Sequence, residues 1–300
     1  MIRCLLAATI GLIALTGCLP IELDVTSTGE VLIPRGEGFY AYNPTTGKVT
    51  QVYATTAKPM FALAVPQRGG LIAISEGGGN NMMGSGMQIE YVDADGKGKT
   101  LTGASNVTYA QVSPDGKRLS FTRVADQSSE GFEQNLPELK VLSTDGGAVT
   151  KLVSNVAMIY RWTPDGKSLV AMKLLTKDED NDLYAGKISM VDAKSGERTD
   201  LANAMGPQGM FLEISPDGTK VLFTALTAGN ADDDLVIENL NEAELKLYEF
   251  DIKTRAVKEV WKGAKFAIYS PKGTKVLIGE DGEDETLELY VTDPSFNGKA

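Results

Sequence analysis

The feature that most constrains this fold is a short turn motif that recurs along the chain at nearly regular intervals. Its clearest copy reads "SPDGKRLSFTR" at 113–123, and close copies occupy 163–173, 215–225 and 270–280. The prolines of these copies lie 50, 52 and 55 residues apart, and the proline of a degenerate copy at 65–75 lies 48 residues upstream of the first. An internal repeat of this period predicts a fold that is built from repeated units.

Each copy lies inside a predicted β-hairpin, and a second hairpin follows it. A short apolar run precedes the turn and a β-rich run follows it. The second pattern is a strand, a tight turn and a strand, and it occurs at 39–53, 89–101, 139–152, 188–201, 245–260 and 287–300. No helical periodicity competes for these segments. Two hairpins per repeat predict an all-β fold, a β-propeller of four-stranded antiparallel blades.

The number of blades depends on the units at the two ends of the sequence, which are both incomplete. The first unit supplies the strands "VLIP", "GFYAYN" and "KVTQVY", and the last lacks a full outer strand. Propellers often combine strands from both termini in one blade, so these two units are candidates to complement each other. We expect six blades, with five as the alternative.

The repeated turn also resembles a known family. "SPDGK" followed by β-rich residues is similar to the WD40-like β-propeller repeat (PD40) of the TolB-type periplasmic propellers. The resemblance covers 60–300 as repeats and 30–53 as a partial unit. It implies the propeller fold and protein partners in the cell envelope. It implies no particular activity, because a fold alone does not assign a function.

The residue types of the motif are those that a tight turn requires. Proline sets φ for the second position of a type I turn, Asp is tolerated at the third, and glycine takes the left-handed conformation that follows. We therefore expect Asp115, Asp165 and Asp217 to be structural residues and not catalytic acids. The copy at 270–280 has Lys272 in the Asp position, which a turn tolerates and a catalytic set would not.

The first residues of the sequence predict export and a lipid anchor. Arg3 precedes an apolar run at 5–15, which is too short to span a membrane and is typical of a signal peptide. "LTGC" at 15–18 resembles the lipobox of bacterial lipoproteins, and this resemblance implies that Cys18 carries the lipid. The alternative is a plain signal peptide or anchor. The predicted organisation is a lipoprotein signal peptide at 1–17, a lipidated tether at 18–29 and the propeller at 30–300.

A lipid on Cys18 would be the only contact of the protein with a membrane. By resemblance to the sorting pattern of lipoproteins, Leu19 in place of Asp after the cysteine favours the outer membrane. The expected location is its periplasmic face or the cell surface. Cys4 would leave with the signal peptide, so no thiol would remain for a disulfide.

The composition argues against several classes of activity. The chain has no histidine, which removes Ser-His-Asp and Cys-His arrangements and the commonest general base. Its 40 acids outnumber its 29 lysines and arginines, which disfavours nucleic acid as a partner. The glycine-rich stretch at 77–87 joins two predicted strands, so we expect a loop there and not a phosphate cradle. Trp162 and Trp261 lie in or beside predicted strands, and we expect core packing of both.

The sequence predicts that positively charged residues gather at one end of the strands and negatively charged residues at the other. The tight turns carry the cations Lys97, Lys99, Lys117, Arg118, Lys167, Lys194, Arg198, Lys253, Arg255 and Lys272. The loops at the other end are acidic, and the candidate binding face consists of Asp178, Glu179, Asp180, Asp182, Asp232, Asp233, Asp234, Asp281, Glu283, Asp284 and Glu285. A plainer interpretation is that these loops only keep an exported domain soluble and protect strand edges.

The leading hypothesis is a non-catalytic protein-binding or scaffold module of the cell envelope, whose acidic face binds a partner. The alternative is a lactonase- or lyase-like enzyme that depends on Ca²⁺ or another divalent ion held by carboxylates. The acids of 178–182 and 232–234 lack the spacing of an EF-hand, so the ligands of such an ion stay undefined. A purely structural or sensor propeller is the third hypothesis. We expect no other cofactor.

Overall fold

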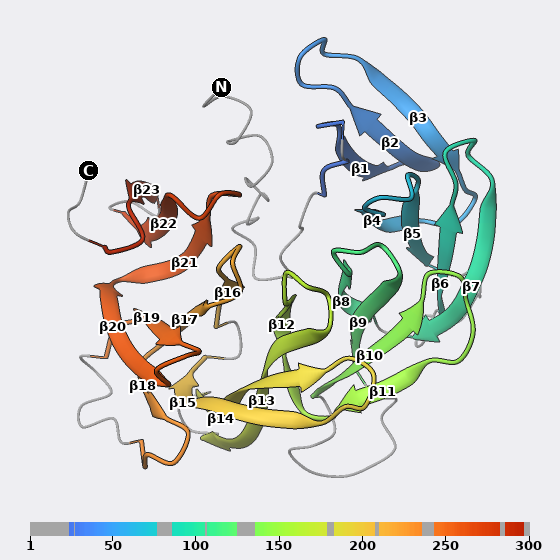
Figure 1. Cartoon of the computed structure of the whole chain (residues 1–300). Coiled ribbons are helices and arrows are strands. Elements are labelled where there is room, and N and C mark those ends of the chain that lie inside the picture. Colours follow the sequence, from blue (N-terminus) through green and yellow to red (C-terminus); the bar gives the residue numbers. More distant parts are fainter. Residues whose placement is uncertain are drawn as a thin grey trace. The chain divides into compact units, whose positions relative to one another are not determined.

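The computed structural model of the chain consists of antiparallel strands and turns, with no helix among the residues that it describes (Figure 1). The described residues are 24–26, 28–76, 86–105, 107–124, 136–178, 183–207, 210–235, 243–282 and 286–296. A search of these ranges for a helix that is long and apolar enough to cross a membrane finds none. The chain divides into two compact units, Met1–Ser128 with Glu138–Lys151, and Ser129–Pro137 with Leu152–Ala300.

The first unit contains three antiparallel sheets among its described residues. The first sheet has the order β1 (Val31–Arg35), β2 (Gly38–Tyr42), β3 (Val49–Ala54). The second has the order β4 (Pro59–Ala64), β5 (Leu71–Glu76), β6 (Gly86–Val92), β7 (Gly98–Ser105). The third consists of β8 (Val107–Val112), β9 (Arg118–Val124), β10 (Pro137–Ser143) and β11 (Thr150–Val153).

The second unit contains the other three described sheets. The first of them has β12 (Val156–Trp162), β13 (Ser168–Asp178), β14 (Leu183–Asp192), β15 (Arg198–Gly206) and β18 (Thr227–Asn230). The middle sheet has β16 (Leu212–Ile214), β17 (Lys220–Ala225), β19 (Lys246–Asp251) and β20 (Ala256–Lys262). The last has β21 (Ala264–Tyr269), β22 (Val276–Asp281) and β23 (Leu287–Thr292). The two predicted hairpins per repeat are therefore confirmed.

The middle sheet of the second unit packs against a neighbouring sheet on each of its two faces. Successive side chains along a strand point to alternate faces, so one strand contributes to both contacts. Val221 and Phe223 of β17 belong to an apolar cluster with residues of β12 to β15. Leu222, between them in the sequence, belongs to another cluster with Tyr269 and Val276 of the last sheet. Complete burial of one such large apolar side chain stabilises the fold by about 1.5–3 kcal/mol. These two layers hold the three sheets of this unit against one another.

The two kinds of connection between strands lie at opposite ends of the sheets, as predicted. The repeated turn joins the first strand to the second in every described sheet but the first, and the second hairpin joins the third to the fourth in the sheets that have a fourth strand. Antiparallel pairing places both connections at one end of the sheet, as the registers of β16 with β17 and of β19 with β20 show. The connection from the second strand to the third lies at the opposite end.

The predicted acidic loop that contains Asp232, Asp233 and Asp234 is preceded by a strand that the sequence does not predict. Residues 227–230 form β18, which leaves its own sheet and pairs with β15 of the preceding sheet, from Met205 opposite Thr227 to Ala202 opposite Asn230. The expected four-stranded unit becomes a five-stranded sheet here. The physical reason is that β15 would otherwise present unpaired backbone N–H and C=O groups along its outer edge.

The folded part of the chain also begins upstream of the predicted boundary at residue 30. The carbonyl oxygen of Asp24 accepts the N–H of Leu32 at 2.8 Å, and its carboxylate accepts the N–H of Ala64 at the same distance. Val25 forms an isolated bridge with Val31. The predicted tether at 18–29 therefore includes residues that pack on β1 and β4, while Cys18 and the signal peptide lie outside the described residues.

Candidate functional site

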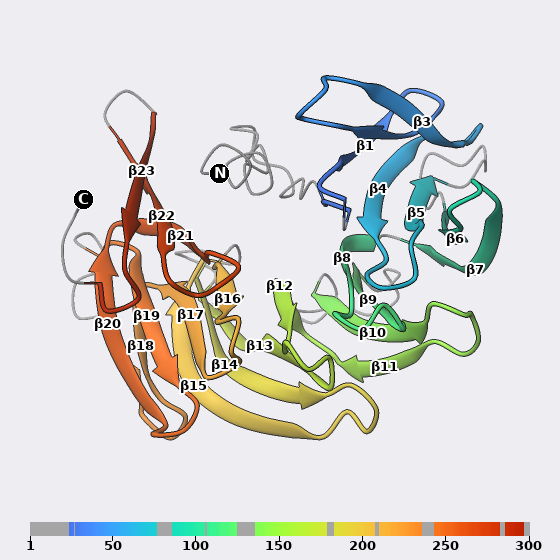
Figure 2. The same cartoon turned by 45° about the horizontal axis from the view of Figure 1, so that its top comes forward.

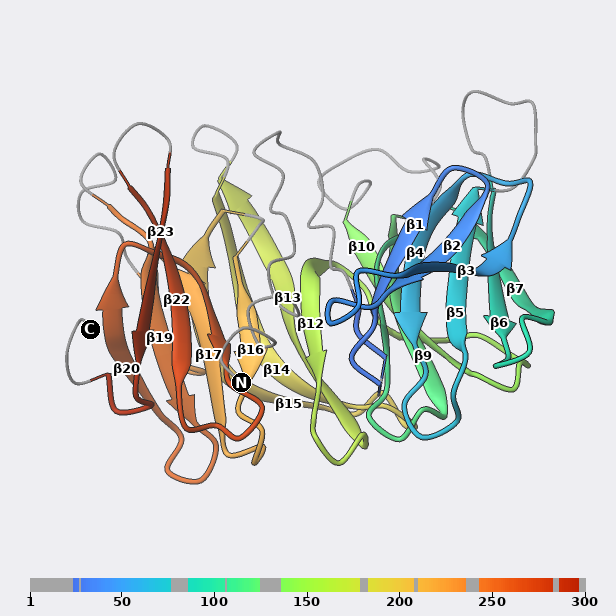
Figure 3. The same ribbon diagram turned by 90° about the horizontal axis from the view of Figure 1, so that it is seen from above.

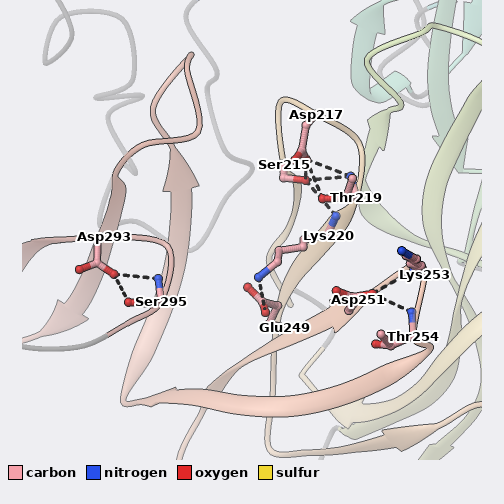
Figure 4. A network of polar contacts seen from close by, with 10 residues as sticks. All are labelled: Ser215, Asp217, Thr219, Lys220, Glu249, Asp251, Lys253, Thr254, Asp293 and Ser295. Atoms are coloured by element: carbon pink, nitrogen blue, oxygen red, sulfur yellow. Dashed lines mark hydrogen bonds and ion pairs between the residues drawn. The ribbon is translucent and has the colours of Figure 1, made fainter.

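The Asp of the repeated motif holds its own turn together. In one copy, the hydroxyl of Ser215 donates to Asp217 Oδ1 at 2.6 Å, and the N–H and hydroxyl of Thr219 donate to the same oxygen at 3.0 and 2.9 Å (Figure 4). The hydrogen bond from Ser215, followed by those from Thr219, lowers the pKa of the Asp217 carboxyl. This carboxylate is thus occupied inside the turn, as the sequence predicts.

The other copies repeat this arrangement. Asp115 and Asp165 each accept the hydroxyl of the residue two positions earlier, at 2.6 and 2.7 Å. In the copy with Lys272, the hydroxyl of Ser270 still accepts the N–H five residues on at 3.0 Å, and Gly273 keeps the left-handed conformation with φ +66°. The turn forms without its acid, so the structural interpretation of the motif is confirmed.

Consecutive turns also touch each other, because the glycine of one turn lies against the proline of the preceding turn. These pairs are Gly116 with Pro66 in the first unit, and Gly218 with Pro164 and Gly273 with Pro216 in the second. A Cβ on Gly116 would lie 2.1 Å from the carbonyl oxygen of Pro66. Glycine is therefore required here both for its positive φ and for the absence of a side chain.

The turn end of the sheets is not simply basic. Arg68 forms an ion pair with Asp145 at 2.8 Å, and Lys99 Nζ donates to the carbonyl oxygen of Asp145 at 2.8 Å. Arg255 Nη2 donates to the carbonyl oxygen of Asp200 at 3.1 Å. Two of the predicted cations, Lys99 and Arg255, are thus tied to neighbouring strands or turns, as is Arg68, and the turn aspartates lie at the same end. The predicted contrast between a basic and an acidic end is too simple.

The predicted acidic face lies only partly within the described residues. The structure describes Asp178, Asp232, Asp233, Asp234 and Asp281. Outside the described residues lie Glu179, Asp180, Asp182, Glu283, Asp284 and Glu285. All the described members belong to the second unit, so their positions relative to one another follow from its sheets.

The described acids do not converge on one point. Asp178 ends β13 and Asp281 ends β22, so both lie at the strand ends opposite the tight turns (Figure 3). Asp232 and Asp234 follow β18, which runs back along β15, so they lie beside the middle of that strand. All four side chains belong to exposed residues. Asp281 forms an ion pair with Lys265 at 2.8 Å.

Asp233 has a structural role that distinguishes it from its neighbours. Its carboxylate accepts the N–H of Asn230 at 2.7 Å, and its carbonyl oxygen accepts Asn203 Nδ2 at 2.7 Å. These bonds close the turn after β18 and attach it to β15. Asp233 therefore fixes the position of Asp232 and Asp234.

The described residues contain no group of three or more carboxylates close enough together to hold a metal ion. A Ca²⁺ site built from three or more carboxylates would have to draw on acids outside the described ranges, which include those at 179–182 and 283–285. The glycine-rich stretch predicted to be a loop is likewise mostly outside them, at 77–85. Both expectations stay predictions.

A polar cluster on the first strands of the second unit is not among the features predicted from the sequence. Arg161 of β12 donates through Nε to Glu213 Oε2 of β16 at 3.0 Å, and their side chains are only 11% and 19% exposed. The guanidinium also lies 5.5 Å from the ring centre of Phe211. A charged pair that is buried to this extent, stacked on an aromatic ring, orients the two strands relative to each other.

This pair left a signal in the sequence. Arg161 and Glu213 each lie two residues before the hydroxyl residue of a repeated turn, and Gln111 occupies the same position in an earlier copy. Polar residues at one repeat position of a buried strand indicate a shared polar layer. Gln111 Nε2 donates to the Tyr109 hydroxyl at 2.8 Å, so this position is hydrogen-bonded in that copy as well.

A second polar group lies on the same face of the middle sheet as Glu213, because Glu213, Leu222 and Glu249 lie opposite one another in the register of its strands. Lys220 Nζ and Glu249 Oε1 form an ion pair at 2.8 Å, also drawn in Figure 4. Burial, with Glu249 as a further cause, raises the pKa of the Tyr269 hydroxyl above its ordinary value. The two tryptophans pack as predicted: Trp162 and Trp261 are 6% and 8% exposed.

Comparison with known proteins defines the fold and not the activity. No protein-family model matches the chain, and no curated protein matches its sequence significantly. Among solved structures, oligogalacturonate lyase from Vibrio parahaemolyticus is similar with a TM-score of 0.66 and 14% identity, over 90% of this chain and 76% of that one. TolB from Acinetobacter baumannii is similar with a TM-score of 0.52 and 15% identity, over 90% and 66%.

The β-propeller domain of the Trilobed protease from Pyrococcus furiosus is similar with a TM-score of 0.50 and 15% identity, over 78% of this chain and 69% of that domain. Together with the antiparallel sheets, these likenesses confirm the predicted fold class: the chain has a TolB-like β-propeller fold. Lyase, peptidase and TolB structures share this fold, so it decides nothing about catalysis. The number of blades stays a prediction.

Proposed function

We propose that this protein is a non-catalytic binding module, whose acidic surface on the second unit binds a protein with a basic surface. One observation carries the proposal: Asp178, Asp232, Asp234 and Asp281 are all exposed, but they belong to separate places on the unit. Carboxylates that are spread over a surface suit a wide basic partner, whereas a metal ion needs its ligands at one point.

The charge of the whole chain supports the same proposal. The net charge of −11 attracts a basic partner over a distance of about one Debye length, roughly 10 Å at 0.1 M salt. Exposed charges of this kind act mainly on the rate of association and on its salt dependence. The carboxylates of Asp165 and Asp217 at the turn end are less available for direct contact with a partner, because they accept hydrogen bonds within their own turns.

The test is a capture experiment with envelope proteins at low and high salt, using a triple variant Asp178→Asn, Asp232→Asn and Asp234→Asn. We expect the natural protein to capture partners at low salt and to lose them at high salt. These partners should associate with the triple variant more slowly, by on the order of tenfold. The matched control removes the same charge elsewhere, with Glu37→Gln, Asp95→Asn and Glu197→Gln, and should bind normally. Equal binding by both variants would overturn the proposal.

We further propose that the module is exported and anchored by lipid on Cys18, at the periplasmic face of the outer membrane or at the cell surface. The support is the resemblance of 15–18 to a lipobox. Replacing Cys18 with Ser should abolish incorporation of labelled lipid and release the protein from membranes. Continued labelling of the variant would contradict the anchor without affecting the binding proposal.

The second candidate function is an enzyme that uses Ca²⁺ or another divalent ion, and the likeness of fold to oligogalacturonate lyase is the observation that favours it. Its cheapest test is thermal unfolding with Ca²⁺, with Mg²⁺ and with EDTA. Binding at 100 times the dissociation constant stabilises a protein by about 2.7 kcal/mol, so a metal site would raise the melting temperature. An unchanged melting temperature at millimolar metal would eliminate this candidate.

A further inference from the structure

The middle and last sheets of the second unit pack against each other through an apolar cluster that also contains a tyrosine. β21 lies against β16, β17 and β19 of the middle sheet (Figures 1 and 2). Tyr269 of β21 belongs to one buried cluster with Leu222 and Leu247 of the middle sheet. The side chain of Tyr269 therefore lies on the face of the middle sheet that carries these leucines.

The hydroxyl of this tyrosine is buried without a hydrogen-bond partner. Tyr269 is 8% exposed, and its hydroxyl oxygen has no partner among the described residues. Losing the hydrogen bonds that water supplies, with no replacement, destabilises a fold. Buried side-chain polar atoms therefore have a partner in most proteins, and that partner is either a protein group or an ordered water.

The facing sheet supplies an acceptor in the same condition. Glu249 of β19 lies opposite Leu222 in the register and two residues after Leu247, so its side chain lies on the face that Tyr269 covers. Its Oε1 accepts from Lys220 Nζ at 2.8 Å. Its Oε2 is buried and has no partner among the described residues. One sheet thus contributes an unpaired donor to this contact, and the other an unpaired acceptor.

The electrostatics of the tyrosine place the two groups near each other. After burial, the carboxylate of Glu249 is the largest cause of the raised pKa of Tyr269, followed by Asp217 and Glu213. Tyr269 Oη and Glu249 Oε2 are nevertheless not hydrogen-bonded to each other, because each is without a partner. Two polar groups that are close but not in direct contact are commonly joined by a bridging water.

The charges at this place favour a neutral bridging group. Lys220 already pairs with Glu249, so a second cation would be repelled by the lysine. An anion would be repelled by Glu213, Asp217 and Glu249. A tyrosine hydroxyl is a donor at neutral pH, and a carboxylate only accepts. The bridging group must therefore accept one hydrogen bond and donate another, which water does with two to four partners.

We propose that a water molecule is held between the middle and last sheets, where it accepts a hydrogen bond from Tyr269 Oη and donates one to Glu249 Oε2. A polar link then runs from Lys220 through Glu249 and the water to Tyr269, inside the apolar contact of the two sheets. The Lys220 side chain is 33% exposed, so the water exchanges with solvent from that side. The site is independent of the acidic surface of the proposed function.

The first test is a high-resolution crystal structure of the natural chain, which requires no variant to fold. We expect density for an ordered water about 2.7–3.0 Å from both Tyr269 Oη and Glu249 Oε2. Density about 2.3–2.6 Å from these oxygens would identify a metal cation and overturn the proposal. A direct hydrogen bond between the two side chains would overturn it as well, as would ordered side chains with no density between them.

The second test counts long-lived waters in solution by oxygen-17 magnetic relaxation dispersion. Tyr269→Phe should have one such water fewer than the natural chain, because the variant lacks the donor. The matched control is Tyr290→Phe in the same sheet, whose hydroxyl donates to Glu288 at the surface. This control should keep the natural count, as should the triple variant of the proposed function. Equal counts for Tyr269→Phe and the natural chain would refute the water site and leave the binding proposal untouched.

Discussion

Arg161 and Glu213 connect the first strands of two neighbouring sheets, with Arg161 Nε 3.0 Å from Glu213 Oε2. They are 52 residues apart in the sequence. Both side chains are mostly buried, so each charge depends on the other for the interactions that it lost with water. This dependence makes the pair the most sensitive polar contact described in the second unit.

Removing one partner of this pair should cost more stability than removing both. We expect Arg161→Met to lower the free energy of unfolding by about 3 kcal/mol, because it leaves the Glu213 carboxylate buried without its cation. The double variant Arg161→Met with Glu213→Leu should recover most of this loss. Urea unfolding of the single and double variants measures the difference. A double variant as unstable as the single variant would contradict this account.

The contact between consecutive turns predicts different costs for two glycines with the same backbone conformation. Gly116 and Gly47 both have φ +69°, but a Cβ would meet Pro66 only at Gly116, and nothing within 4 Å at Gly47. Alanine at Gly47 should cost about 1 kcal/mol from backbone strain alone. Alanine at Gly116 should cost clearly more, measured by thermal or urea unfolding. Equal costs would mean that the turns do not depend on each other.

The turn aspartates should make stability depend on pH in the acid range. Hydrogen bonds from the backbone of Lys167 and from Thr163 lower the pKa of Asp165, and the turn of Asp217 acts similarly. A lowered pKa in the folded state stabilises the fold above the unfolded pKa, which is about 3.9 for Asp. This contribution is lost as the pH falls through the folded pKa.

Replacing Asp165 and Asp217 with Asn should therefore lower stability at pH 7 and flatten its decline in acid. The measurement is the free energy of unfolding between pH 7 and pH 3. The control is Asp234→Asn, because Asp234 is exposed and no turn hydrogen bond to its carboxylate is described. If the free energy of unfolding falls as steeply in acid for the double variant as for the natural chain, the two aspartates do not have this role.

The turn after β18 should depend on the carboxylate of Asp233. Asp233→Ala removes the acceptor of the Asn230 N–H, so we expect the pairing of β18 with β15 to open more often. Amide hydrogen exchange of 227–230 should accelerate severalfold. The neighbouring change Asp232→Ala should leave this exchange unchanged. Unchanged exchange in Asp233→Ala would show that β18 is held by its strand pairing alone.

The parts of the structure that follow from the sequence are those whose determining contacts are local. The turn around Asp217 forms from residues that are at most five positions apart, so its conformation can be inferred from residue types alone. The strands follow from the spacing of such turns. For the same reason, the structural role of the repeated Asp was predictable, and Lys272 supplied an internal check.

The features that were missed depend on contacts between sheets. Nothing in the residues at 227–230 alone indicates that they pair with β15, because both partners of that pairing must be placed first. The ion pair of Arg161 and Glu213 joins two sheets, and only comparison of equivalent repeat positions could have suggested it. The candidate binding acids were predicted as one face, and β18 separates Asp232 and Asp234 from the strand ends.

The contacts of Gly116, Gly218 and Gly273 with the proline of the preceding turn have a consequence for where the chain can accept additional residues. The spacing of the repeats varies between 48 and 55 residues, but the glycine–proline contact recurs at one end of the sheets in each unit. This contact aligns neighbouring sheets of one unit with each other at the end that carries the repeated turns. Additional residues are then accommodated at the opposite end or along the outer edges, as in β18. Insertions and grafted loops should be tolerated there without disturbing the alignment of neighbouring sheets.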